Sequence, residues 1–250
     1  MCDTDWIKCD LHIHTLDDPK DALDYSAHEL LERACSLGFS VLAITLHDAV
    51  FDNPGVFADA KRMGILLIPA SELRVQGADI VLLNVSRDDI AGIEDFDGIR
   101  RLRERKGEGI FTFAPHPFYV LGGSIGERLI EDIDCFDAIE FCHFYLSFMN
   151  PNRRAAEVAA QFGKPLIATS DAHRLQAFGR HYTTVRRPAA LDVMSFLTAL
   201  RAGPLRLTSP PGTIWDIVSA AWFIFVAHKW RLWRRRDARS ATEGSVHDHR

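Results

Sequence analysis

The chain has 250 residues, of which 47% are hydrophobic and 25% are charged, and its formal net charge is −5. This length and composition fit an ordinary globular protein with a large core, in one barrel-sized domain or two small ones. Basic residues crowd into eleven positions near the C-terminus, so the rest of the chain is more acidic than the total indicates and is not a general nucleic-acid binder: Lys229, Arg231, Arg234, Arg235, Arg236 and Arg239.

The first predicted strand covers residues 6–11 and leads into Asp10-Leu11-His12-Ile13-His14-Thr15. Because side chains alternate between the two faces of a strand, Asp10, His12 and His14 are expected to point the same way. Two imidazoles and a carboxylate on one face are ligands that suit zinc, manganese or iron. A lone His-x-His pair is weak support for a metal site in a chain rich in histidine, so the interpretation depends on the rest of the sequence.

Helical segments then alternate with apolar segments of strand length. A Ser-x-x-Glu capping box at Ser26 opens a helix that ends at Gly38, and Asn53-Pro54 reads as the N-cap and first residue of another helix. Further helices are predicted over residues 88–106, 125–133, 150–163 and 189–203. The strands after the first are predicted over residues 39–45, 65–69, 80–85, 110–114, 136–141 and 165–170.

Such alternation predicts βαβ units, a parallel sheet with right-handed crossovers and, with seven strands, a barrel. Histidine and acidic residues follow the ends of these strands: His47, Asp48, Glu72, His116, Glu140, His143, Asp171 and His173. Barrel enzymes build their sites at the C-terminal ends of the strands, so this placement predicts a site there. Asp18 and Asp21 lie in the first loop, and a set of this size can hold two or three metal ions.

The C-terminal part of the chain departs from this pattern. Residues 204–212 read as a linker, and residues 217–227 are nearly all apolar with basic residues directly after them. This run is too short and too interrupted for a membrane span. Two alternatives stay open, an interfacial helix at an anionic membrane and a helix docked on the barrel or on a second subunit. The expected domains are therefore 1–203, 204–239 and a disordered tail, 240–250.

The five cysteines form an odd number without Cys-x-x-Cys spacing, and the N-terminus lacks the basic and apolar regions of a signal peptide. A cytoplasmic location is expected, with peripheral membrane association through the C-terminal helix as the open alternative.

Six motifs, in this order, resemble those of the PHP (polymerase and histidinol phosphatase) domain family. They are Asp10-Leu11-His12-Ile13-His14-Thr15, Ile44-Thr45-Leu46-His47-Asp48, Ser71-Glu72, Pro115-His116-Pro117, Ile139-Glu140 and Ser170-Asp171-Ala172-His173. The resemblance spans residue 8 to about residue 185. It implies a distorted seven-stranded (β/α)7 TIM-like barrel, two or three divalent ions (zinc, manganese or iron rather than magnesium) and hydrolysis of phosphoesters.

The resemblance also implies roles for individual residues. His12, His14, Glu72 and Asp171 resemble the ligands of one metal ion, with Glu72 bridging to a second. Ligands of the other ions would be His47, His116 and His173, with Asp18 or Asp21 as the loop carboxylate. Catalytic proton transfer to the leaving oxygen is assigned to His143 or His173. Arg174 and Arg180 are candidates for binding the substrate phosphate.

Three positions depart from the family pattern. Leu46 stands where an acidic residue is usual, which bears on the orientation of His47. Asp79 stands where many members have a histidine, and His143 replaces an asparagine, so either residue is open as a further ligand.

These observations predict a metal-dependent phosphoesterase that hydrolyses a small phosphomonoester or short nucleotide by metal-activated hydroxide. One alternative is a 3′–5′ exonuclease-like phosphodiesterase. Another is a non-catalytic metal-binding module recruited through its C-terminal helix. The expected partner is the phosphorylated substrate, without a stable nucleic-acid partner, and residues 213–239 would mediate peripheral membrane contact or self-association.

Overall fold

A computed structural model of the chain describes residues 5–119, 122–213 and 215–216. The strands are β1 Trp6–Ile13, β2 Phe39–His47, β3 Leu66–Val75, β4 Ala78–Leu83, β5 Phe111–Ala114, β6 Ala138–Phe141, β7 Leu166–Ala168, β8 Tyr182–Arg186 and β9 Leu205–Thr208. The helices are α1 Ala27–Leu37, α2 Pro54–Arg62, α3 Arg87–Ile90, α4 Phe96–Lys106, α5 Arg128–Glu131, α6 Asn152–Phe162 and α7 Val193–Ala202, with short 3₁₀ turns at Gly107–Gly109 and Ile133–Cys135.

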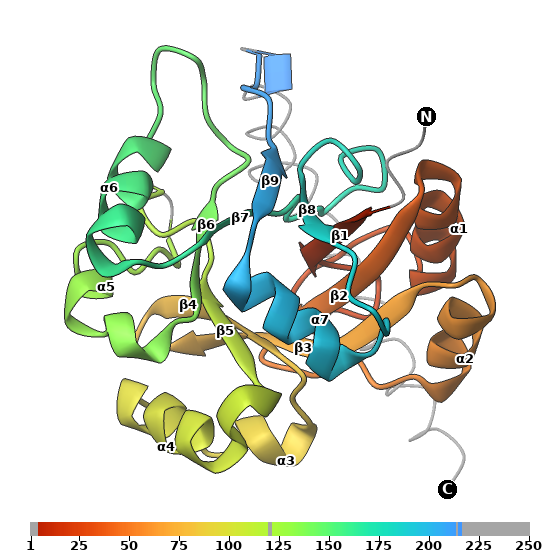
Figure 1. Ribbon diagram of the computed structural model, residues 1–250, viewed down its shortest axis with the longest axis horizontal. Coiled ribbons are helices and arrows are strands. Elements are labelled where there is room, and N and C mark those ends of the chain that lie inside the picture. The colour runs from red at the N-terminus through yellow and green to blue at the C-terminus, as the bar shows by residue number, and fades with distance from the viewer. Residues whose placement is uncertain (1–4, 120–121, 214, 217–250) are drawn as a thin grey trace, which may run out of the picture.

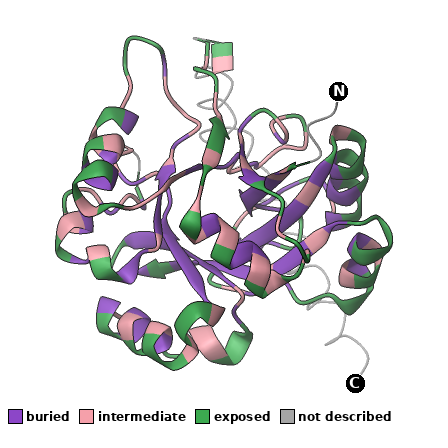
Figure 2. Ribbon diagram, viewed as in Figure 1, coloured by how far each residue is buried: buried purple, intermediate pink, exposed green. Residues whose placement is uncertain are grey.

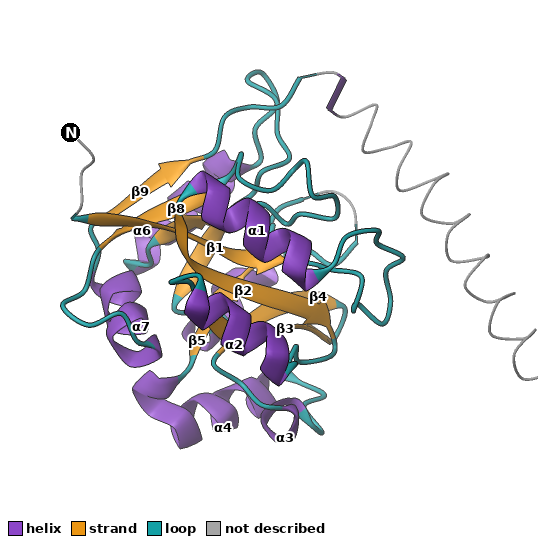
Figure 3. Ribbon diagram, turned by 90° about the vertical axis from the view of Figure 1, so that its right-hand side faces the viewer, coloured by secondary structure: helices purple, strands orange, loops and turns teal. Residues whose placement is uncertain are grey.

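The strands form one sheet in the order β7-β6-β5-β4-β3-β2-β1-β8-β9, and helices lie around its outside (Figures 1 and 3). The sheet curls until β7 comes back to β8 and β1. The hydroxyl of Thr183 accepts from the Ala168 amide and donates to the Ala168 carbonyl, both at 2.8 Å. Next to it, Ile13 bridges to Ala172, and the His14 amide donates to the Ala172 carbonyl at 3.2 Å. The result is an α/β fold with a nearly closed, barrel-like sheet.

The strand number and directions correct the prediction of seven parallel strands. The pairs β3–β4, β4–β5, β1–β8 and β8–β9 are antiparallel. Gln76 and Gly77 alone connect β3 to β4, and both have positive φ, 49° and 88°. A two-residue turn with this geometry makes a hairpin and leaves no room for a crossover helix. Neither β8 nor β9 was predicted, and β9 lies within the stretch expected to be a linker.

Local signals placed the helix ends well. Ser26 caps α1 through a capping box with Glu29, and Gly38 ends that helix at φ 73°. Asn53 caps α2, with Pro54 as its first residue. The helix expected over 88–106 is divided into α3 and α4, because each has its own side-chain cap, from Ser86 and Asp95. Short α5 and a 3₁₀ turn stand where a single helix was expected over 125–133.

The core has an inner and an outer layer, and the strands between them are largely buried (Figure 2). Inward-facing apolar residues of the strands, such as Val41, Ile68 and Phe113, form one cluster with Phe196 and Leu197 of α7. The outward-facing strand residues pack against the surrounding helices in two further clusters. Apolar side chains therefore fill the barrel beside α7, and polar side chains occupy its interior at the opposite, C-terminal strand ends.

Among the described residues, no helix is long and apolar enough to cross a membrane. The predicted Trp/Arg-rich helix from residue 217 onward and the tail 240–250 lie outside the described residues.

Candidate metal centre

Glu72 of β3 lies at the centre of the polar cluster, with only 3% of its surface exposed. Its Oε1 lies 3.4 Å from the Nε2 atoms of both His12 and His116. Its Oε2 lies 3.4 Å from Nε2 of His14 and 3.2 Å from Nε2 of His47. One carboxylate thus faces four imidazoles that come from the ends of β1, β2 and β5.

Asp171, just after β7, joins the same cluster. Its Oδ1 lies 3.4 Å from Nε2 of His12 and 3.3 Å from Nε2 of His14. Both Asp171 and His116 have left-handed backbone conformations, with φ 44° and 30°. Such a conformation costs a non-glycine residue about 1–3 kcal/mol and persists only where the surrounding structure enforces it. The surrounding structure therefore holds these two residues in a strained backbone conformation that directs their side chains into the cluster.

These separations suit atoms that share a metal ion. An ion held tetrahedrally at about 2.0–2.2 Å keeps neighbouring donor atoms about 3.4 Å apart. Nε2 of His12 and Nε2 of His14 are buried and have no hydrogen-bond partner among the described residues. Buried polar atoms almost always have a partner, so two buried nitrogens without one call for an explanation. Coordination of a metal ion would supply the missing partner. Three sets of donors around these atoms could each hold an ion: His12 with His14 and Asp171; His12 with Glu72 and His116; and His14 with His47 and His173.

Asp18 supports the histidines from behind. Its Oδ2 lies 3.1 Å from Nδ1 of His14 and 2.9 Å from Nδ1 of His47, so each ring presents Nε2 to Glu72. Its Oδ1 accepts the backbone amides of Lys20 and Asp21 at 2.9 and 3.0 Å. Because protein donors occupy both oxygens, the geometry favours Asp18 as a residue that orients ligands over the predicted role of ligand.

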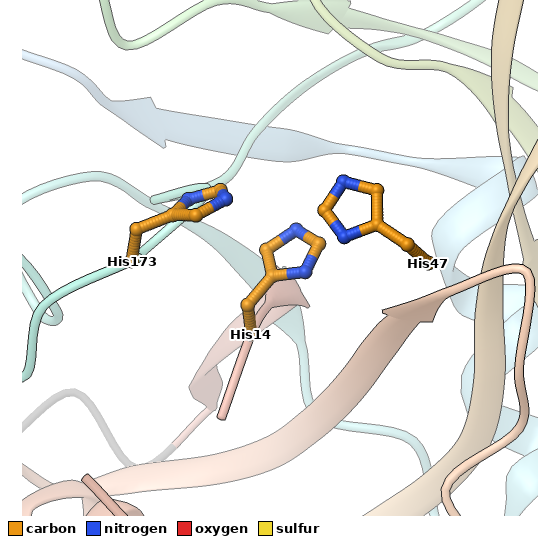
Figure 4. A group of neighbouring side chains, drawn as sticks. All are labelled: His14, His47 and His173. Carbon is orange, nitrogen blue, oxygen red and sulfur yellow. The ribbon is translucent and has the colours of Figure 1, made fainter. Parts of the chain in front are cut away.

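The third donor set lies at the rim of the cluster. Figure 4 shows the rings of His14, His47 and His173 gathered together. The ring centres are 4.5 Å apart for His14 and His47 and 4.4 Å apart for His14 and His173. Nε2 of His173 lies 2.8 Å from Oδ2 of Asp21. Asp21 and Asp18 also form a possible ion site with His47. The structure thus brings together all eight residues that the sequence predicted as metal ligands.

Glu140 of β6 completes the centre, although the predicted site residues did not include it. This buried carboxylate lies 3.5 Å from Nδ1 of His12 and accepts hydrogen bonds from the Thr169 hydroxyl and the His116 amide. It therefore fixes both a ring and a backbone segment of the cluster. The available signal was its position, since Glu140 follows the same strand-end pattern as Glu72.

The electrostatics of the cluster favour positive charge. Burial would lower the pKa of His47, but Asp18 and Glu72 raise it to about 9. Burial would likewise lower the pKa of His173, but Asp171 and Asp21 raise it to about 9. Burial would raise the pKa of Asp18, yet hydrogen bonds from His14 and His47 hold it well below its usual range. An excess of buried carboxylate of this kind attracts protons or metal cations.

Two carboxylates considered in the sequence do not enter the cluster. Asp10 was expected to share a face with His12, but the register of β1 shifts between Asp10 and Ile13, and such a bulge re-aims side chains. Its Oδ1 instead accepts the Ser170 amide at 3.1 Å, and burial raises its pKa to about 7. Asp79, open as a ligand, forms a two-pronged ion pair with Arg74, with Nη2 and Oδ2 2.9 Å apart. Its partner is therefore a guanidinium.

A cavity of about 210 Å³ opens beside the centre. Three candidate ligands line it, His116, Asp171 and His173, and so do both predicted catalytic histidines, His143 and His173. The other lining residues are Tyr119, Cys142, Phe144, Ser170, Arg174 and Ala177. Burial lowers the pKa of His143, so its ring is neutral at pH 7. Arg174 lines this cavity, whereas Arg180 lines only an adjoining one of about 390 Å³. Of the two predicted substrate-binding arginines, Arg174 therefore lines the cavity that includes candidate ligands, and Arg180 does not.

A family model described as PHP-associated matches residues 150–205. In sequence, the chain is 28% identical over 149 residues to the uncharacterized protein MJ1587 of Methanocaldococcus jannaschii, which covers 56% of this chain and 83% of that protein.

Solved structures share the fold. A two-domain protein of Bacteroides vulgatus containing a predicted PHP-like metal-dependent phosphoesterase matches with TM-score 0.57 and 19% identity, over 78% of this chain and 63% of that one. PsfC of Pseudomonas syringae matches with TM-score 0.59 and 15% identity, over 79% and 90%. The lesion-specific endonuclease EndoQ of Pyrococcus furiosus matches with TM-score 0.57 and 15% identity, over 87% and 66%. This chain therefore spans about two thirds of the Bacteroides and Pyrococcus proteins.

The resemblance to the PHP family is confirmed in the family-model segment and in the fold, which is shared with proteins of identity between 15% and 19%. At this level of identity the solved structures show a shared fold and not a shared reaction.

Proposed function

We propose that the chain is a metal-dependent phosphoesterase that hydrolyses a small phosphomonoester or a short nucleotide. The observation that carries this proposal is the carboxylate of Glu72, which presents each of its oxygens to two imidazole Nε2 atoms at 3.2–3.4 Å. A carboxylate in this position can bridge two neighbouring ions. Pairs of ions about 3.5–4 Å apart serve phosphatases and nucleases.

The residues divide into ligands and supporting groups. His12, His14, His47, His116 and His173, together with Glu72 and Asp171, would hold two or three divalent ions, with zinc, manganese or iron suited to this mixture of imidazole and carboxylate. When bound, such ions lower the pKa of a coordinated water toward about 7 and stabilise negative charge on a phosphate. Asp18 and Glu140 keep the rings in place.

Further residues act from the cavity wall. Arg174 would contact a phosphate through its guanidinium, which matches phosphate oxygens in geometry and charge. His143 and His173 both line the same cavity, so either side chain could carry the proton that the leaving oxygen needs. His143 is neutral at pH 7 because burial lowers its pKa, so it would have to take up a proton before donating one. His173 could donate only in a centre where it does not coordinate an ion.

We further propose a cytoplasmic location, with peripheral membrane contact or self-association through residues 213–239.

The same centre could act on a phosphodiester, as in the exonuclease-like alternative. The non-catalytic alternative differs from both enzymatic ones in predicting bound metal without turnover.

The test is hydrolysis of p-nitrophenyl phosphate and bis-p-nitrophenyl phosphate with and without Mn²⁺, for the wild type, His14→Ala and His28→Ala. His28 is a surface residue that pairs with Asp59 at 3.1 Å, away from the centre, so it serves as the matched control. We expect monoester hydrolysis that depends on added metal, is lost in His14→Ala and is retained in His28→Ala. Preference for the diester would support the phosphodiesterase alternative, and absence of turnover on both esters would contradict an enzymatic role.

A further inference from the structure

A second cavity continues the one beside the candidate centre. It has a volume of about 390 Å³. Both cavities are lined by His143, Phe144, Ser170, Arg174 and Ala177. The space that begins at the candidate ligands therefore extends away from them, and a substrate whose phosphate sits at the centre would place its remaining part there.

The far end of this second cavity is formed by the last described part of the chain. We call residues 209–213 with Asp216 the C-terminal wall. The Tyr145 hydroxyl donates to the Ser209 carbonyl at 2.6 Å, and the Gly212 amide donates to the Tyr145 carbonyl at 2.8 Å. These bonds join the wall to a residue that lines the cavity, so the wall and the cavity keep a defined relation.

Arg180 lines the second cavity and binds the C-terminal wall through an ion pair and a hydrogen bond. Its Nη1 lies 3.1 Å from Oδ2 of Asp216, and its Nη2 donates to the Pro211 carbonyl at 3.3 Å. The side chains of Arg180 and Asp216 are 41% and 42% exposed. An ion pair this open to solvent is weak and exchanges partners easily.

Asp216 has a second task that does not need its charge. Its Oδ2 accepts from the amide and the hydroxyl of Thr213, at 2.7 and 2.9 Å, and its own amide donates to the Thr213 hydroxyl at 3.2 Å. An asparagine could keep the oxygen that accepts these bonds. The structural and electrostatic roles of Asp216 can therefore be separated by substitution.

The charges at the far end of the second cavity come from Arg180 and Asp216. Among the described lining residues, Asp216 is the carboxylate, and it pairs with Arg180. His181 adds no charge at neutral pH, because burial and the neighbouring His143 and Arg180 lower its pKa to about 3. Without Asp216, the far end of the cavity would carry uncompensated positive charge.

We propose that Arg180 is a binding site for an anionic group, carboxylate or phosphate, on the non-reacting part of the substrate, and that Asp216 occupies this site until the substrate arrives. This inference rests on the proposed function, since the phosphoester at the centre sets where the second anion lies. Arg180 then exchanges one anion for another, and Asp216 remains bound to Thr213. The site selects phosphoesters that carry a second negative charge.

The kinetic test compares phenyl phosphate with 4-carboxyphenyl phosphate, which differ by one carboxylate. The measured quantity is the ratio of their KM values in the wild type, Arg180→Ala, Asp216→Asn and the double variant. We expect the wild type to favour the carboxylated ester and Arg180→Ala to lose about tenfold of that preference. Asp216→Asn should gain about threefold, but only while Arg180 is present. Equal ratios in all four proteins would overturn the inference.

A binding measurement separates this inference from the proposed function. Calorimetry with 4-carboxyphenyl phosphate and EDTA-treated protein needs neither metal nor turnover. We expect affinity to fall in the order Asp216→Asn, wild type, Arg180→Ala. Arg186→Ala is the matched control, because Arg186 is 65% exposed on β8 and lines neither cavity. The same order without hydrolysis would support the anion site and contradict the phosphoesterase, whereas hydrolysis with identical affinities would do the reverse.

Discussion

Among single residues, Asp18 shows how a hydrogen-bond partner of a candidate ligand determines which ring nitrogen can bind an ion. It contacts His14 and His47 through Nδ1, the ring nitrogen that faces away from Glu72. An ionised carboxylate only accepts hydrogen bonds, so both rings must donate from Nδ1 and keep the Nε2 lone pair for an ion. One side chain thereby fixes the tautomer of two candidate ligands.

Replacing Asp18 tests this role. In Asp18→Asn an NH2 group replaces one of the two accepting oxygens, so it faces either the two ring N–H groups or the backbone amides of Lys20 and Asp21. Donor then opposes donor, the rings lose their fixed orientation, and metal affinity should fall about 10–100-fold. The measurement is competition for Zn²⁺ or Mn²⁺ against a chromophoric chelator. Asp17→Asn is the control, because Asp17 accepts from the Thr15 hydroxyl at 3.0 Å and lies outside the donor sets. Equal affinity in both variants would contradict an orienting role for Asp18.

Residue identity and order were enough to predict which side chains gather in the cluster of candidate ligands. The path of the backbone around them could not be predicted in the same way. His12, His14 and Glu72 could be found because imidazoles and carboxylates at strand ends have few structural reasons to be there. The position of Asp10 was wrong because a bulge in β1 breaks the alternation of faces on which the prediction depended. The role of Asp18 depends on which nitrogen it touches, and this is fixed only when β1, β2 and the first loop meet.

At the scale of elements, the segment after β5 is fastened to β4 by close packing. Gly123 has φ 98°, and its carbonyl accepts the Asp79 amide at 2.7 Å. A Cβ at this position would lie 1.8 Å from Oδ2 of Asp79, the oxygen that binds Arg74. This contact lies on the segment that begins at His116, so it also helps to position a candidate ligand.

We therefore expect Gly123→Ala to destabilise the protein by more than about 1 kcal/mol, since it combines an unfavourable φ with a clash against an ion pair. Urea denaturation measures the free energy of unfolding. Gly122→Ala is the matched control, because a Cβ there would meet no heavy atom of the described residues within 4 Å. Equal stability of the two variants would contradict the packing argument.

Helix ends were predictable because their signals are local. Ser26, Asn53 and Gly38 act within one turn of their own helices, and the structure has them as expected. Strand direction depends on distant partners and on turn geometry. The turn at Gln76–Gly77 makes β4 antiparallel, and nothing in the apolar run of β4 itself records that direction.

In the molecule as a whole, Asp137 joins elements at the end of the barrel opposite the candidate metal centre. Its carboxylate binds Arg103 of α4 at 2.7 and 3.0 Å, Arg201 of α7 at 3.3 Å and the Thr112 amide of β5 at 2.8 Å. Burial would raise its pKa, but the hydrogen bonds and charge of Arg103 lower it below the ordinary value. One carboxylate, with its side chain 10% exposed, therefore holds together segments that are far apart in sequence.

The sign of the pH dependence follows from that lowered pKa. An unfolded aspartate titrates near pH 3.9, so the stabilisation is complete above that pH and is lost as the pH falls through the lower folded-state pKa. We expect Asp137→Asn to lose about 3 kcal/mol of unfolding free energy at pH 6–7, and the difference from wild type to shrink below about pH 4. Asp97→Asn is the control, with a side chain 70% exposed. A difference independent of pH would contradict this assignment.

The overall architecture was predictable to the level of a barrel with its polar site at the C-terminal strand ends. Alternating apolar runs and helices indicated it, and the positions of the histidines indicated which end is functional. The added strands β8 and β9 were not predicted, because their residues are only partly buried and lack a continuous apolar run. Strand β8 is placed by pairing with β1, a contact between segments about 175 residues apart, and β9 is placed by pairing with β8.

The proposed metal centre depends on Glu72, the carboxylate that the four surrounding histidines share. Its most direct test is the number of divalent ions per chain, measured by mass spectrometry of the metal after dialysis against Zn²⁺ or Mn²⁺, for the wild type and Glu72→Gln. We predict two or three ions in the wild type and at most one in Glu72→Gln, because an amide offers a single weak oxygen where the carboxylate offers two. A wild type without bound metal, or a Glu72→Gln variant with the full number of ions, would contradict the bridged centre.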